Sequence, residues 1–430
     1  MAIVNVNGIS GINSITAQST SLNFYTAGGS TLSIGASVNG NVTGNLTGNV
    51  TGNLTGNINA TGLSTFSGGI QVGDTLLRSN SIGIGTTTTT GRNAGVGTAT
   101  GTLIYNSSTG SVEGYFGTTI GWVTIKNGFA ATGGNVVISP GNGYRYHTFT
   151  SSSGSFVVSN GTANIEVLLV GGGGAGGFDV GGGGGAGGLV YAPAMSIGPG
   201  TYPVTVGAGG AAVVIGSTPA TPGNGSPSTF NGLTALGGGG GGNWQSISGA
   251  AGGSGGGPTS NVSGSAGPGT QPAQLHTAGT AYLSFGRPGG GGAGNTPNAN
   301  DYSGAAGGGG AGGDGGGGAS SGWSADSTTI GYGGPGLQFP QFTGPLIGVP
   351  SLAPLNGYFA GGGGSASDGG SFYGRGGTGG GAPGVTPSLP GLATANTGGG
   401  GGGAGVTPSY SPINKGGNGG SGILVIRYLE

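Results

Sequence analysis

The chain has 430 residues, of which 120 are glycine and 22 are proline, and it contains no cysteine. Only 4% of its residues are charged, against about 25% in ordinary globular domains, and the formal net charge is −1. These values exclude a disulfide scaffold and, because the six arginines and two lysines are scattered singly, a nucleic-acid-binding protein. Glycine does not recur at every third position as in collagen, and no apolar run approaches the roughly 18 residues that a membrane-spanning helix needs.

Residues 1–39 are expected to form an N-terminal attachment segment, and residues 40–60 consist of tetrapeptide repeats such as Gly-Asn-Val-Thr. A period of four stays in phase with the two-residue period of a strand, so one apolar row shares a face with the glycines: Val42, Leu46, Val50, Leu54 and Ile58. A single strand cannot bury this row or pair its own backbone. The pattern therefore predicts the shaft of a trimeric fibre; a flexible Gly/Asn/Thr linker is the alternative. The start of the chain has no basic and apolar leader, so we expect no secretory signal, and glycosylation of the sequons in this region is not expected.

Residues 61–128 are predicted to be a small β module of short strands and turns. Strand-like residues 103–105 and 112–116 flank the turn 106–110, which indicates a hairpin. The pattern Gly-x-Leu-x-Tyr-Asn from Gly101, followed by a turn and later by Gly121-Trp122, resembles small β modules found between the shaft and the tip of phage tail fibres.

Residues 129–430 are predicted to form a glycine-rich domain. Residues 144–149 alternate as a strand, with residues 155–159 as its expected partner. The apolar strand 165–170 runs directly into a glycine run, and its comparably apolar counterpart is the strand at 423–429, so we expect these two strands to pair and close the domain. Residues 188–192 and 200–207 flank a Gly-Pro-Gly turn and predict a further hairpin.

Four motifs occur in order in this domain: the strand from Tyr144, the junction at 165–174 where a strand leads into a glycine run, Pro-Gly-Thr-Tyr-Pro-Val-Thr-Val-Gly from Pro199, and the C-terminal segment Gly-Ile-Leu-Val-Ile-Arg-Tyr. Together they resemble the glycine-rich C-terminal domains of phage tail-fibre and adhesin-like proteins, over about residues 135–430. The resemblance implies a role on a virion or a cell surface and does not name a receptor.

The glycine runs predict an unusual structure. Residues 171–430 contain 89 of the 120 glycines, in runs such as 171–177, 181–188, 237–242, 289–292, 307–318, 361–364, 369–381 and 398–403. Glycine is costly to order, so a folded run needs a compensating interaction. Polyglycine II helices, which have three residues per turn, supply it when neighbouring helices hydrogen-bond on several sides. We expect a bundle of such helices, with Phe178-Asp179-Val180 reversing the chain and alanines marking outer positions; a disordered low-complexity region is the alternative.

The predicted fold class is thus mostly β and irregular: a repetitive β shaft, a small β-hairpin module, and a glycine-rich domain with strands and a polyglycine II bundle, with little or no α-helix. No catalytic spacing of carboxylates or histidines is visible, and with no cysteine and two distant histidines we expect no enzyme activity, no metal and no cofactor. The inserts between the glycine runs carry aromatic side chains among uncharged polar ones, a composition typical of binding surfaces. The candidate receptor-binding residues are Trp244, Tyr282, Phe285, Trp323, Tyr332, Phe339, Phe342, Tyr358 and Phe359. The alternative is that these rings only cover the bundle.

The sequence predicts a non-enzymatic, receptor-binding phage tail-fibre protein located in the virion. Its expected partners are itself, as a homotrimer or higher assembly, other virion tail proteins, and a bacterial surface glycan or outer-membrane protein; nucleic acid and membrane insertion are not expected. On this hypothesis, deletion of residues 319–360 should abolish adsorption without unfolding the shaft. The main rival is a self-assembling extracellular or surface filament built on a glycine lattice, and an ice-binding protein is a more distant one.

Overall fold

The computed structural model describes residues 70–72, 75–77, 82–95, 99–125, 128–214, 221–260, 264–275, 281–291, 304–318, 331–367, 373–385, 391–405 and 415–430. The predicted attachment segment and tetrapeptide shaft, residues 1–39 and 40–60, lie outside these ranges. Strands are the main regular structure (31%) and there is almost no helix (5%), as the sequence predicts. The described part of the chain contains one α-helix, α1 (Thr89–Gly95). The short strands β1 (Ile70–Val72), β2 (Thr75–Leu77) and β3 (Ile82–Gly83) form a three-stranded sheet.

The small β module is a four-stranded sheet with the order β4–β5–β6–β7, formed by Thr86–Thr87, Leu103–Asn106, Ser111–Tyr115 and Trp122–Thr124. The predicted hairpin is confirmed, because β5 and β6 pair antiparallel with Leu103 opposite Gly114. One face of the sheet is closed by α1, whose Arg92 bonds the buried carboxylate of Glu113 at 2.7 Å. Ile104 and Tyr115 are buried on that same face.

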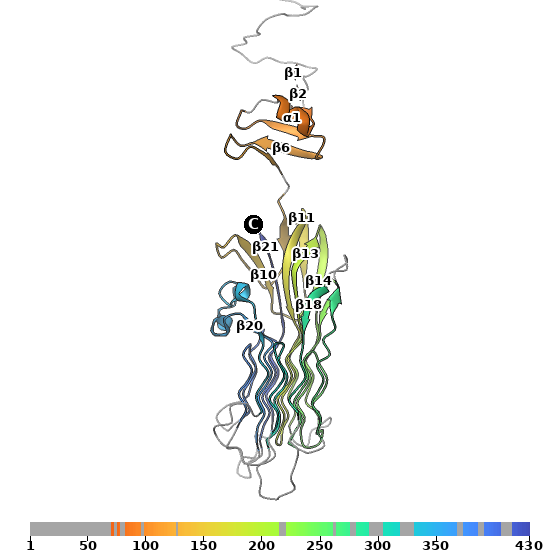
Figure 1. Cartoon of the computed structure of the whole chain (residues 1–430), viewed down its shortest axis with the longest axis vertical. Helices are drawn as coiled ribbons and strands as arrows, with labels where there is room; N and C mark the ends of the chain where they lie inside the picture. Colours follow the sequence, from red (N-terminus) through yellow and green to blue (C-terminus); the bar gives the residue numbers. More distant parts are fainter. Residues whose placement is uncertain are drawn as a thin grey trace, which may run out of the picture. The chain divides into compact units, whose positions relative to one another are not determined.

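The glycine-rich domain contains a sandwich of two antiparallel sheets (Figure 1). The seven-stranded sheet has the order β17 (Gln274–Leu275), β18 (Ala281–Phe285), β13 (Leu189–Ile197), β12 (Ala163–Val170), β21 (Ile423–Leu429), β10 (Tyr144–Phe149) and β9 (Val136–Ile138). The five-stranded sheet has the order β16 (Leu233–Ala235), β15 (Ser228–Phe230), β14 (Gly200–Thr205), β11 (Gly154–Asn160) and β8 (Ala130–Thr132). Buried side chains of both sheets, including Phe156, Leu169 and Phe230, form the core between them.

The pairing of the two most apolar strands is confirmed. β12 and β21 are antiparallel neighbours at the centre of the seven-stranded sheet, with Leu168 opposite Val425. Central strands are covered on both faces, and for this reason they read as continuous apolar runs rather than as alternating ones.

Two predicted pairings are wrong. β10 pairs with β21 and β9, whereas β11 pairs with β14 and β8, so the segment 155–159 is not the partner of 144–149. Likewise β13 belongs to the seven-stranded sheet and β14 to the five-stranded one. In both places the chain crosses from one sheet to the other at its turn, and a sandwich requires such crossings, which a local hairpin pattern cannot reveal.

A third layer covers the other face of the seven-stranded sheet. It consists of β19 (Leu337–Gln338), the 3-10 helices η1 (Pro340–Phe342) and η2 (Pro350–Leu355), and β20 (Tyr358–Phe359). Proline begins each 3-10 helix, where its missing N–H costs nothing. Phe342, Ile347 and Phe359 are buried against Leu168 and Val425 of the sheet.

Beyond the strands, the glycine runs form polyglycine II helices. In the run 171–177 every third amide donates to the same neighbouring run: Gly171, Gly174 and Gly177 to 181–188, Gly172 and Ala175 to 222–226, and Gly173 and Gly176 to 415–422. The N···O distances in this set are 2.8–3.0 Å. A repeat of three residues in the direction of hydrogen bonding is what a helix with three residues per turn produces. The polyglycine II prediction is therefore confirmed.

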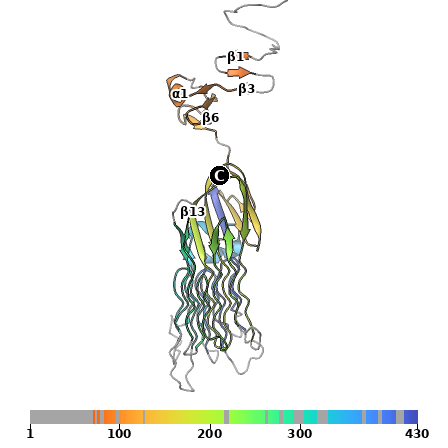
Figure 2. The same cartoon turned by 90° about the vertical axis from the view of Figure 1, so that its right-hand side faces the viewer.

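Several of these helices lie side by side and form a bundle that continues the strands (Figure 2). The glycine bundle is made of the described runs 171–177, 181–188, 207–211, 222–226, 236–242, 249–260, 264–269, 286–291, 304–318, 331–336, 360–367, 373–385, 398–405 and 415–422. Strand β12 leads directly into the run 171–177, and the run 181–188 leads back into β13. The end of the bundle at which residue 177 turns to residue 181, away from the strands, is called the far end below.

The central run 181–188 has six neighbours. Its amides donate to the runs 236–242, 304–311 and 398–404, and its carbonyls accept from 171–177, 254–257 and 363–366. A Cβ atom on Gly183 would overlap the carbonyl oxygen of Gly363, and one on Gly184 would overlap that of Gly174. The hydrogen-bonded contact between backbones thus depends on the absence of side chains, which is why these runs are glycine.

The reversal at Phe178-Asp179-Val180 is confirmed: Asp179 and Val180 have φ values of 55° and 53°, and the amide of Gly177 donates a hydrogen bond to the carbonyl of Gly182. The prediction that alanines mark outer positions is only partly right: Ala208, Ala211 and Ala251 are exposed, but Ala175, Ala186, Ala311 and Ala360 are buried. Three of them, Ala186, Ala311 and Ala360, pack in the cluster beneath the third layer. A methyl group fits there because the helices meet apolar side chains rather than another backbone.

Candidate functional site

The nine aromatic residues proposed from the sequence fall into distinct environments. Four are buried, namely Tyr282, Phe339, Phe342 and Phe359. Phe285, Tyr332 and Tyr358 are half-buried, Trp244 is 59% exposed, and Trp323 lies outside the described residues. A buried ring cannot contact a receptor on the surface. The four buried residues therefore serve the packing of the domain, as the alternative interpretation, in which these rings only cover the bundle, predicts. Trp244 is the candidate that the structure presents to solvent.

Trp244 projects from a tight turn at the far end of the bundle. The buried side chain of Asn243 closes this turn, because its Oδ1 accepts hydrogen bonds from the amides of Gln245 (2.8 Å) and Ser246 (2.7 Å). The amide of Asn243 in turn donates to the carbonyl of Ser246 at 2.8 Å. An asparagine that binds the backbone two residues ahead fixes the turn locally. The indole is therefore held outward on a rigid support.

Other exposed apolar side chains lie at the same end. Val214 and Lys415 form a bridge at the ends of their runs, and Tyr373 forms a bridge with Ala366. Tyr373 is 45% exposed and stands where the run 373–385 begins. Leu392 is 58% exposed and follows Gly391, whose carbonyl accepts a hydrogen bond from Gly402 near the far end. The sequence-based proposal missed Tyr373 because it lies within the stretch 369–381 that was counted as a glycine run. An aromatic residue interrupting a glycine run was the available signal.

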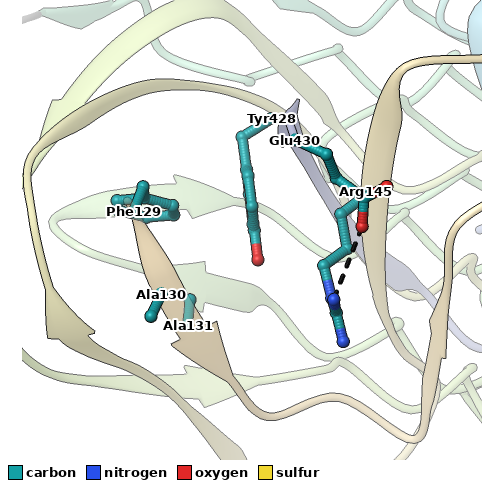
Figure 3. Close-up of a pocket in the computed structure, with 6 residues that line it drawn as sticks. All are labelled: Phe129, Ala130, Ala131, Arg145, Tyr428 and Glu430. Carbon is teal, nitrogen blue, oxygen red and sulfur yellow. Dashed lines mark hydrogen bonds and ion pairs between the residues drawn. The ribbon is translucent and has the colours of Figure 1, made fainter. Parts of the chain in front are cut away.

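A pocket of about 430 Å³ lies in the sandwich, away from the far end (Figure 3). It is lined by Phe129, Ala130, Ala131, Arg145, Tyr428 and Glu430. Phe129 meets Tyr428 edge to face with ring centroids 4.6 Å apart, and Arg145 lies 3.4 Å from the carboxylate of Glu430. Two aromatic walls beside an exposed ion pair could accept a small polar molecule. This pocket was not foreseen from the sequence, since its residues come from three separate parts of the chain, in or next to β8, β10 and β21.

Comparison with known protein families places the chain in a family. The model of a family described as "Glycine-rich domain" matches residues 148–429. The chain belongs to this glycine-rich domain family. The matched residues run from β10 to β21 and therefore include both the sandwich and the bundle of the glycine-rich domain. No curated protein matches the chain.

A polar cluster ties the third layer of the glycine-rich domain to its seven-stranded sheet. The carboxylate of Glu166 accepts hydrogen bonds from Arg427 Nε (2.5 Å), Tyr191 Oη (2.5 Å) and Gln341 Nε2 (2.9 Å). Burial and the bond to Glu166 raise the pKa of Tyr191 to about 12. The Arg427 guanidinium also lies 4.2 Å from the ring centroid of Tyr144. These groups satisfy one another across β12, β13, β21 and η1, so the arrangement fits a structural link.

The described part of the chain shows no group of three or more His, Asp or Glu side chains arranged to hold a metal ion. None of the helices in that part has the length and apolar character that crossing a membrane requires. Within the described residues of the glycine-rich domain, the exposed side chains at the far end and the pocket of the sandwich are the candidate binding features.

Proposed function

We propose that the glycine-rich domain is the receptor-binding tip of a phage tail fibre and acts without catalysis. The observation that carries the proposal is the gathering of exposed Val214, Trp244, Tyr373 and Leu392 at the far end, where the helices turn. The backbone-bonded helices form a support whose folding does not depend on the side chains displayed at its end. Such an end can change its binding side chains while keeping the domain folded, a property that suits recognition of variable bacterial surfaces.

The proposed setting is the virion. The chain would assemble with copies of itself, as a homotrimer, and with other tail proteins, and its far end would contact a surface glycan or an outer-membrane protein. Support comes from the sequence resemblance of residues 135–430 to tail-fibre and adhesin-like domains. The rival filament built on a glycine lattice is less favoured, because the central runs 171–177 and 181–188 already find their hydrogen-bonding neighbours within one chain.

Immunogold electron microscopy tests the location. Antibody against the full chain should label the fibre ends of particles released from lysed cells that carry the gene. Labelled fibre ends support the tail-fibre role, whereas label on continuous filaments or on cell envelopes supports the rival.

Binding of the fluorescent full chain to a panel of bacteria tests the surface. Trp244→Ala is expected to weaken binding at least tenfold, because an exposed aromatic plane contributes large contact area at a low entropic cost. Leu283→Ala is the matched control, since Leu283 is similarly exposed but lies on β18 of the sandwich. Equal binding by the two variants would contradict the assignment of the far end.

The deletion of residues 319–360 suggested by the sequence does not isolate the binding surface. Residues 337–359 form the third layer, and Phe342, Ile347 and Phe359 are buried in its core. Their removal would unfold the glycine-rich domain and abolish binding for that reason alone. Deletion of residues 319–330 leaves this layer in place and is the appropriate experiment.

A further inference from the structure

Among the residues that the structure describes, nothing covers one face of the sheet of the small β module. Its large apolar side chains Leu103, Tyr105, Phe116, Val123 and Ile125 are each 40–50% exposed. They share one face, since Leu103 lies opposite Gly114 and Gly114 opposite Val123, and residues two apart in a strand point the same way. At the centre, the side chains of Leu103, Phe116 and Ile125 surround Gly114. These five residues form a continuous surface, the apolar face.

The opposite face of the same sheet is complete. There α1 supplies Arg92 to the buried Glu113, which also accepts a hydrogen bond from Asn106 at 3.0 Å. Arg92 and Glu113 are the ionised side chains between residues 82 and 125, and both lie on that face. The apolar face therefore carries no charge. Contiguous exposed apolar surface of this kind marks an interface, because leaving it in water is unfavourable.

A second copy of the chain fits this face better than an unrelated partner does. Two identical surfaces repel each other when they carry charge, and the apolar face has none. The sequence of residues 40–59 also predicts contact with neighbouring chains. Its apolar residues, from Val42 to Ile58, recur at every fourth position and so share one face of a strand, which a single chain cannot cover. Identical chains that run side by side bury both surfaces through one arrangement.

We infer that the apolar face of β5, β6 and β7 is an interface between copies of this chain. The inference names the surface through which the assembly of the proposed function forms, and its test uses no receptor. Failure of the cell-binding experiment and failure of this one are therefore separate results.

Cysteine cross-linking of the full chain reads this interface directly, because the natural chain has no cysteine and each cross-link reports the introduced site. In Val123→Cys the thiol lies on the apolar face. In the matched control Thr90→Cys it lies exposed on α1, which covers the opposite face. With a short thiol-specific cross-linker, Val123→Cys is expected to give covalent dimers at least ten times more efficiently than Thr90→Cys. Equal yields from the two variants would overturn the inference.

Sedimentation equilibrium of the natural chain and of Val123→Glu supplies the second measurement. We expect the natural chain to be oligomeric, and the glutamate, which places like charges against each other, to raise the dissociation constant at least tenfold. The exposed position of Val123 allows this change without unfolding, which an unaltered circular dichroism spectrum checks. A monomeric natural chain, or an oligomer whose dissociation constant Val123→Glu leaves unchanged, would show that the apolar face does not join copies of the chain.

Discussion

The sandwich and the glycine bundle share one domain but are held together by opposite means. In the sandwich, Phe156, Phe230 and Leu169 fill the space between two sheets, and stability comes from the apolar surface that their side chains bury. In the bundle, the helices approach so closely that a Cβ atom on most glycines would overlap a neighbouring backbone. Its order comes from backbone hydrogen bonds, which join the central run 181–188 to six neighbouring runs. A protein can therefore build a densely packed region almost without side chains, provided that strands anchor its ends.

A large effect is expected where a side chain is added to the centre of the bundle. In Gly183→Ala the new Cβ would overlap the carbonyl of Gly363, which accepts the amide of Gly308 at 2.9 Å. The helices would have to separate, so we expect the free energy of unfolding to fall by about 3 kcal/mol or more, toward the upper end of overpacking effects. Hydrogen exchange followed by mass spectrometry should show faster exchange in the runs 181–188, 304–311 and 360–367.

Gly291→Ala is the control for that substitution, since no atom lies within 4 Å of a Cβ placed there. It should leave exchange in the bundle unchanged or raise the free energy of unfolding by about 0.4–1 kcal/mol, because alanine restricts the unfolded chain. Similar losses from both alanines would mean that close backbone contact does not hold the bundle together.

In the sandwich, stability should be lost when a buried side chain is shortened rather than when one is added. Phe156 is fully buried and meets Phe230 and His147 with centroids 6.2 and 5.1 Å apart. Phe156→Ala should lower the free energy of unfolding by about 3–5 kcal/mol, measured by calorimetry or by denaturant titration. Val137→Ala, at an exposed position on β9, should change it by less than about 0.5 kcal/mol. If these two variants lose comparable stability, the side-chain account of the sandwich fails.

The sequence revealed the two kinds of region, but it revealed few of the neighbour relations within them. β12 and β21 could be paired in advance because each is an apolar run long enough to be covered on both faces. The crossings between the sheets at residues 150–153 and 198–199 could not be predicted, because they arise only when the domain folds into two sheets. In the bundle the limit is more severe. One glycine run offers the same backbone groups as any other, so the six neighbours of 181–188 follow from the strands and turns that place each run.

The exposure of the candidate binding residues was predicted less well than the fold, for a related reason. Phe342 and Phe359 were candidates because they stand in an uncharged, aromatic-rich insert, and that composition is the same for a binding loop and for a covering layer. Only the fold shows that Pro340 and Pro350 begin 3-10 helices that lay this insert on the sheet. Trp244 lies on the surface because Asn243 closes its turn, a local feature that can be recognised in sequence.

A smaller effect is expected from the polar link between the sheet and its third layer. Glu166→Gln removes the charge that pairs with Arg427 and leaves that guanidinium largely buried without its partner. We expect a loss of about 3 kcal/mol, at the lower end for a broken buried pair. The pKa of Tyr191 should also fall from about 12 toward its usual value, which an alkaline absorbance titration can follow.

The exposed pair of Arg145 and Glu430, 3.4 Å apart, provides the comparison. Arg145→Gln should cost less than about 1 kcal/mol, because solvent screens an exposed ion pair. A loss for Glu166→Gln no larger than this would show that the polar link adds nothing beyond a surface contact.

The smallest expected effect is a dependence of stability on pH, which we expect in the sandwich because it contains a buried histidine. His147 is fully buried in the sandwich, where Nδ1 lies 2.7 Å from the carbonyl of Gly133 and Nε2 lies 3.1 Å from the hydroxyl of Tyr428. Because a carbonyl can only accept, Nδ1 carries the proton and Nε2 accepts from Tyr428. Burial lowers the pKa of His147 below 6.5, the nearby charge of Arg145 lowers it further, and the bond to Gly133 opposes both.

Since the pKa of His147 is lower in the folded state than in the unfolded state, the unfolded chain takes up the proton first as the pH falls. Stability from this group is complete above pH 6.5 and declines below it, by at most about 1.4 kcal/mol per pH unit, until the folded pKa is reached. Denaturant titrations between pH 7.5 and 5 should show this decline for the natural chain and a flatter profile for His147→Phe. The glycine runs 171–177 and 181–188 contain no ionisable side chain, so a profile that His147→Phe leaves unchanged would place the pH-sensitive group outside the sandwich core.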